Sequence, residues 1–107
     1  MRTLKFIVDD QIITKDPACD FSNLVSGSEG YLQAKFSFTP AWDGCVKVAG
    51  FYSVMGEEYQ PQLLKDGDTC IIPSEACKRQ EFKIRVFGKK DGFKITTNKV
   101  VVNQNGG

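Results

Sequence analysis

Apolar and polar residues alternate over several short stretches of the chain, with the period of a β-strand. Residues 32–38 place Leu, Ala, Phe and Phe at every second position, and residues 82–86 place Phe, Ile and Val in the same way. Because strand side chains point alternately to the two faces of a sheet, each stretch predicts a strand with one buried face. Residues 45–54 are apolar in both alternating sets, which favours a strand near the centre of a sheet.

Pairs of turn-forming residues predict two hairpins. Asp9-Asp10 separates two β-rich stretches at the start of the chain, with Asp10 expected at positive φ. Asp66-Gly67 separates two further apolar stretches, and Asp-Gly is a strong hairpin signal. Pro61 lacks a backbone N–H, so it favours an edge position for the strand before that turn.

The remaining segments are irregular, briefly helical or form a last hairpin. Residues 16–30 are dense in turn formers and predict a long connection, whereas residues 73–77 predict one short helical turn with Ser74 as its cap. The loop of residues 88–92 reverses the chain, and residues 93–102 are expected to return as a strand.

These elements predict an all-β fold: an immunoglobulin-like antiparallel β-sandwich of about seven to eight strands, with at most one short helical turn. Residues 1–103 are expected to form a single domain, and residues 104–107 a frayed polar tail. The Cys-Trp-Cys arrangement of antibody domains is not evident, so the immunoglobulin likeness concerns architecture only.

The composition agrees with one folded domain, and it also bears on where the chain is expected to be found and on the state of its cysteines. Of the 107 residues, 41% are apolar and 25% charged, and no apolar run approaches the ~18 residues that cross a bilayer. Without a signal-peptide pattern, the chain is expected to be made and kept in the cytoplasm, or packaged from there. The 4 cysteines form no C-x-x-C pair, which favours free thiols over disulfides.

Candidate catalytic chemistry is sparse. The chain has 0 histidines, which removes the usual general base and the commonest transition-metal ligand. No phosphate-binding glycine loop occurs, and the acidic pairs at Asp9-Asp10, at Glu57-Glu58 and around Gly67 are interpreted as turn and loop residues rather than as glycosidase or calcium sites. We therefore expect no enzyme activity, no cofactor and no metal.

The charge is uneven along the chain. The net charge is +1, yet residues 1–76 hold six basic and eleven acidic side chains, while residues 77–107 hold eight basic and two acidic ones. The excess of basic side chains in residues 77–107 can favour an anionic partner, unless the fold interleaves this segment with the more acidic one.

The basic residues of the last hairpin are candidate binding residues. Lys83 and Arg85 share one strand face, Lys94 is expected to join them across the hairpin, and Lys89 and Lys90 lie near its tip. Two interpretations stay open: contact with phosphates or with an acidic protein surface, and a solvated sheet face whose lysines discourage aggregation, which is the commoner case.

Three aromatic residues complete the candidate partner surface. Trp42 follows Pro40 and Ala41 at a corner, where it either anchors a partner or, as the preferred interpretation, plugs the end of the sandwich. Phe51 and Tyr52 are adjacent in one strand, so both cannot face the same core and one is expected to face outward.

Several segments, taken together and in order, resemble small immunoglobulin-like domains encoded by phages and prophages of Firmicutes, often described as structural or baseplate-type proteins. The segments span almost the whole chain, and the resemblance implies phage origin and a β-sandwich without carrying over a catalytic residue. They are Phe6-Ile7-Val8-Asp9-Asp10-Gln11, Lys35-Phe36-Ser37-Phe38, Trp42-Asp43-Gly44, Lys47-Val48-Ala49-Gly50-Phe51, Cys70-Ile71-Ile72-Pro73, Val86-Phe87-Gly88 and Ile95-Thr96-Thr97-Asn98-Lys99-Val100.

Three functions follow as hypotheses. The leading one is a virion-associated module of a tail, baseplate or capsid that binds a phage structural protein in assembly or adhesion, where self-association would suit a symmetric particle. The alternative is a small inhibitor in the host cytoplasm, of the anti-CRISPR type, that binds a defence effector or its nucleic acid through the basic residues. The third, a carbohydrate-binding module with Trp42 and Tyr52 as stacking platforms, ranks lower.

Overall fold

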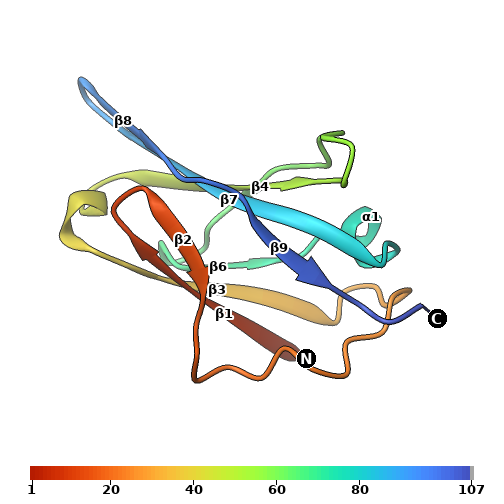
Figure 1. The fold of residues 1–107 in the computed structure, drawn as a ribbon. Coiled ribbons are helices and arrows are strands. Elements are labelled where there is room, and N and C mark those ends of the chain that lie inside the picture. Colours follow the sequence, from red (N-terminus) through yellow and green to blue (C-terminus); the bar gives the residue numbers. More distant parts are fainter. Residues whose placement is uncertain (107) are drawn as a thin grey trace.

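The protein is described by a computed structural model that covers residues 1–106. Two β-sheets pack face to face (Figure 1), and the predicted all-β sandwich is confirmed, with nine strands within these residues. The strands are β1 (Arg2–Asp9), β2 (Ile12–Lys15), β3 (Leu32–Phe38), β4 (Val46–Tyr52), β5 (Gln62–Leu63), β6 (Thr69–Ile71), β7 (Glu81–Lys90), β8 (Phe93–Thr96) and β9 (Val100–Asn103). Two short helical turns, η1 (Pro40–Trp42) and α1 (Ser74–Cys77), connect strands.

One sheet has the order β2-β1-β3-β6, and the other has the order β5-β4-β7-β8, with β9 also pairing with β7. β8 pairs with the final third of β7 and β9 with its beginning, so both lie along one edge of that strand. Every strand pair is antiparallel except β1 and β3, which run parallel with Arg2 opposite Leu32. The long connection between β2 and β3 returns the chain to the end where β1 starts, which makes this parallel pairing possible.

The predicted turns formed, but one of them does not join paired strands. Asp10 takes a φ of 51° between β1 and β2, as expected. Asp66 takes a φ of 51° and Gly67 a φ of 79°, yet β5 pairs with β4 while β6 pairs with β3. The predicted hairpin is therefore wrong: this turn carries the chain from one sheet to the other, and a single bridge between Lys65 and Thr69 closes it.

The short helical turn after β6 is confirmed, although Ser74 is its first residue and not its cap. Pro73 occupies the capping position, and no side chain caps the turn. The turn η1 at Pro40–Trp42 was not predicted, since those residues were interpreted as an irregular corner. Proline suits a first helical position because its fixed φ matches the turn.

The segment after the last hairpin is interrupted, so residues 93–102 form β8 and β9 rather than one strand. Thr97 is 6% exposed, and its Oγ1 accepts a hydrogen bond from the backbone N–H of Val86 at 3.0 Å. The Oδ1 of Asn98 accepts one from the N–H of Ile13 at 2.8 Å, in the opposite sheet. The Thr97 side chain thus replaces a ladder bond within its own sheet, and the Asn98 side chain ties the two sheets together.

The expectation of a frayed tail is wrong for Gln104 and Asn105, while Gly107 lies outside the described residues. Gln104 is 7% exposed, and its Nε2 donates to the carbonyls of Cys77 at 3.2 Å and Arg79 at 2.7 Å. The backbone N–H of Asn105 donates to the carbonyl of Leu24 at 2.7 Å. The start of β1 and the segment after β9 lie away from the projecting β7–β8 hairpin (Figure 1).

The core lies between the sheets and draws on both. The rings of Phe6 and Phe36, on neighbouring strands, stack with centroids 5.4 Å apart. The largest fully buried side chains are Trp42, Phe6, Phe36, Phe51, Phe82, Leu4, Ile13, Leu32, Ile72, Ile84, Val8 and Val86. Apart from Trp42 in η1 and Ile72 just after β6, these are the inward positions of the strands, so the opposite positions form the two outer faces.

Candidate functional site

Two of the three predicted partner-binding aromatics belong to the core. Trp42 is fully buried, its ring centroid lies 5.0 Å from that of Phe38, and its Nε1–H donates to the carbonyl of Asp10 at 2.8 Å. Phe51 is also fully buried. Neither ring can contact a partner of the folded protein, and Trp42 plugs the end of the sandwich as the preferred interpretation held.

Tyr52, the third aromatic residue, lies on the outer side of the five-stranded sheet, although only 6% of it is exposed. Its ring is folded back over Gly50, since a Cβ at Gly50 would lie 2.6 Å from its hydroxyl oxygen. Burial raises the pKa of the Tyr52 hydroxyl, and the nearby charge of Arg85 acts in the opposite direction. The expectation that one of Phe51 and Tyr52 faces outward is therefore met by Tyr52, under a cover of other side chains.

Arg85 lies between two rings on this outer side. Its Cζ is 5.7 Å from the Tyr52 centroid and 4.7 Å from the Phe87 centroid, and its buried Nε has no hydrogen-bond partner within residues 1–106. The Nζ of Lys99 lies 4.2 Å from the Tyr52 centroid. Contacts of this kind are worth about 0.5–1 kcal/mol each at exposed sites, so they hold the guanidinium in place.

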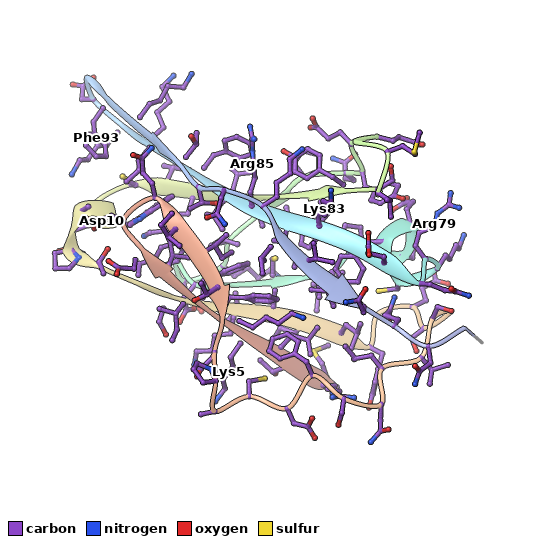
Figure 2. The ribbon with its side chains drawn as sticks, in the orientation of Figure 1. Lys5, Asp10, Arg79, Lys83, Arg85 and Phe93 are labelled. Carbon is purple, nitrogen blue, oxygen red and sulfur yellow. The ribbon has the colours of Figure 1, made fainter. Side chains whose placement is uncertain are left out.

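We call the outer side of the sheet formed by β4, β5, β7, β8 and β9 the basic face. Lys83 and Lys94 lie on it with Arg85, as predicted, and Lys89, which was expected only near the hairpin tip, lies there too. Figure 2 shows Lys83 and Arg85 on the side of β7 away from β1. Lys89 is directly opposite Lys94 in the ladder. Cβ atoms of such cross-strand pairs lie about 4.5–5.5 Å apart, and two like charges there are destabilising.

Lys90 does not join the other lysines. It follows Lys89 in the strand and points to the other side of the hairpin, where its Nζ donates to the carbonyl of Asp43 at 2.9 Å and lies 4.8 Å from the Phe93 centroid. The side chains of Lys89, Lys90, Phe93 and Lys94 border a shallow hollow of about 300 Å³ at the hairpin.

Phe87 and Lys99 are members of the basic face that the sequence interpretation missed. Phe87 has the same strand parity as Lys83 and Arg85, so alternation was a signal that could have identified it. Lys99 lies in the break between β8 and β9, whose geometry no local pattern revealed.

Apolar side chains complete the basic face. Val46 is 62% exposed and directly opposite Lys89, Leu63 is 64% exposed and directly opposite Val48, and Val48, Phe87 and Val101 on the same face are partly buried. The basic face therefore carries exposed apolar side chains as well as cations.

The cysteines are free thiols in two environments. Cys19 and Cys45 are partly exposed, whereas Cys70 and Cys77 are buried. Burial raises the pKa of the Cys70 thiol to about 12 and also raises the pKa of the Cys77 thiol, to which Glu75 adds a smaller effect. The two buried thiols are therefore protonated and poorly nucleophilic near neutral pH.

Within residues 1–106, no group of three or more His, Cys, Asp or Glu side chains is arranged to hold a metal ion. Over the same part of the chain, no helix has the length and apolar character to cross a membrane. Searches with the whole chain against protein-family models, curated proteins and solved structures find no match.

Proposed function

We propose that this chain is a non-catalytic protein-binding module of a phage particle, attached to its tail, baseplate or capsid, where it acts in assembly or adhesion. The observation that supports binding is the basic face, on which Val46 and Leu63 are exposed beside Arg85 and four lysines. The phage setting comes from the resemblance of the sequence segments.

The composition of the basic face suits a protein contact. Interfaces are enriched in aromatic residues and arginine near their centre, with polar residues at the rim. Arg85 and Phe87 lie on the central strand β7, whereas Lys94 lies on the neighbouring β8 and Leu63 on the edge strand β5. The stacked guanidinium is already ordered, which reduces the entropy lost on binding.

Repetition of the subunit in a phage particle also makes a weak contact sufficient for attachment. Tails and baseplates repeat one subunit around a symmetry axis, and repeated weak contacts reinforce one another through effective concentration. Self-association of this chain would serve the same purpose. On this proposal the protein is made in the bacterial cytoplasm and ends in the virion.

The basic face also supports the alternative function, a small inhibitor in the host cytoplasm that binds a defence effector nuclease or its bound nucleic acid. Arg85 and the lysines would then contact an anionic groove of that complex. Carbohydrate binding is not proposed, because Trp42 is fully buried and the ring of Tyr52 is covered by Arg85 and Lys99.

Two parallel assays test the proposal. An epitope-tagged chain should co-sediment with purified phage particles from the bacterium that carries the gene, and should remain after a high-salt wash that strips a tagged unrelated protein. Phage plaquing should not change when the chain is expressed in a CRISPR-defended host or in its defence-free twin. Rescue confined to the defended host, with no protein in the particles, would establish the inhibitor function instead.

A further inference from the structure

We infer that the basic face binds an acidic protein surface, with Arg85 as its fixed central cation. The inference rests on the proposed function and names the chemistry of its partner. Five cations share this face, Lys83, Arg85, Lys89, Lys94 and Lys99. Within residues 1–106, none of them forms an ion pair with a carboxylate of the chain itself.

The position of Arg85 is built by its neighbours. Gly50 is opposite Arg85 in the ladder, and the absence of a side chain there lets the Tyr52 ring fold across the strand. The Cζ of Arg85 then lies 5.7 Å from the Tyr52 centroid and 4.7 Å from the Phe87 centroid, so both rings restrict where the guanidinium can move. Arginine held in this way presents a fork of donors that matches a carboxylate.

The lysines point to the same chemistry. Lys89 and Lys94 are opposite each other across the hairpin and border its hollow. Within residues 1–106, no acidic side chain forms an ion pair with either lysine, so their mutual repulsion is not relieved. A carboxylate of a partner placed between them would relieve this repulsion.

The partner chemistry is protein rather than nucleic acid. Proteins that bind single strands stack bases on free aromatic faces, whereas the rings of Tyr52 and Phe87 are occupied by Arg85 and Lys99. A phosphate backbone would also leave the exposed Val46 and Leu63 without apolar contacts. An acidic protein surface with apolar side chains satisfies both kinds of residue.

The opposite sheet supplies a matched control. Lys5 of β1 and Lys35 of β3 are also directly opposite each other and exposed, on the outer side of the four-stranded sheet. Figure 2 shows Lys5 on the far side of the molecule from Arg85. The double variants Lys89→Glu/Lys94→Glu and Lys5→Glu/Lys35→Glu therefore make the same charge change at two directly opposed lysine pairs on different faces.

The experiment is a titration of the isotope-labelled full chain, followed by amide NMR shifts, with a glutamate-rich peptide and with single-stranded DNA of equal charge. The peptide should shift amides of β4, β7 and β8, and the Lys89→Glu/Lys94→Glu variant should bind it at least about tenfold more weakly. The Lys5→Glu/Lys35→Glu variant should bind like the wild type. Tighter binding of DNA than of the peptide, or an equal loss in both variants, would overturn the inference.

Gly50→Ala tests the fixed cation without altering any charge. The new Cβ displaces the Tyr52 ring from beneath Arg85, so peptide binding should weaken several-fold while the lysines stay in place. Unchanged affinity would remove Arg85 as the centre of the site.

Incorporation into phage particles separates this inference from the proposed function. Absence of the wild-type chain from the particles contradicts the proposed function, whereas equal incorporation of the wild type and both double variants contradicts only the binding role of the basic face.

Discussion

The close approach of β7 to the Trp42 ring makes Gly88→Ala an informative substitution. A Cβ at Gly88 would lie 2.7 Å from Cε3 and Cζ3 of Trp42 and 3.0 Å from Cγ2 of Ile95. The ring has little room to retreat, because it is fully buried and its Nε1–H is bonded to the carbonyl of Asp10 at 2.8 Å. Either the strand or the ring must therefore move.

Two opposing effects determine how much Gly88→Ala changes the free energy of unfolding. Overpacking a core by one methyl group costs about 1–3 kcal/mol. Replacing glycine by alanine where the backbone permits it contributes about 0.4–1 kcal/mol of stability through the unfolded chain, and the φ of Gly88 lies outside the left-handed region. We expect a net loss of about 1–2 kcal/mol, or a Tm lower by roughly 4–16 °C for a domain of this size.

Thermal and urea unfolding followed by circular dichroism measures the loss. Gly50→Ala is the comparison variant, because its new Cβ meets the Tyr52 ring on an outer face, where that side chain can swing into solvent. The ring then loses its contacts with Arg85 and Lys99, while replacing glycine restricts the unfolded chain, so these effects partly cancel and the net loss should be smaller than that of Gly88→Ala. In a Trp42→Leu background, Gly88→Ala should destabilise much less, because only the contact with Ile95 remains. Wild-type stability for Gly88→Ala, or the same loss in both backgrounds, would refute the reasoning.

Further expectations concern the tail and the buried thiols. Gln104→Ala should lower the free energy of unfolding by about 0.5–1.5 kcal/mol in urea titrations, because the carbonyl of Arg79 loses its side-chain donor and that of Cys77 keeps only the Gly27 N–H; no change would mean that the tail is frayed in solution. Cys70 and Cys77 should react with a thiol reagent at neutral pH only as fast as the protein unfolds, whereas fast reaction of all four cysteines in the native protein would contradict their burial. The pKa of the Cys70 thiol is about 12 in the folded protein and 9.0 in the reference thiol, so the unfolded state loses this proton first as the pH rises. The free energy of unfolding should therefore fall between pH 9.0 and pH 12, and a Cys70→Ala variant should show a shallower fall.

The sequence alone determined the class of fold and the sidedness of its strands. Strict alternation in β3 and β7 is a local consequence of strand geometry, so it predicted which residues face the core and that Lys83 and Arg85 share the outer side. Turn residues such as Asp10 and Asp66 were identified for the same reason, because positive φ restricts the residue types locally.

Only the tertiary structure decided which strands pair and what covers each side chain. The Asp66-Gly67 turn formed as predicted, but the strands on its two sides joined different sheets, since pairing depends on burial against distant strands. Trp42 is buried because η1 turns it between the sheets where Gly88 leaves room, and Tyr52 lies flat because Gly50 is beneath it. Such contacts join residues that no local pattern relates, and they place Arg85 at the centre of the basic face.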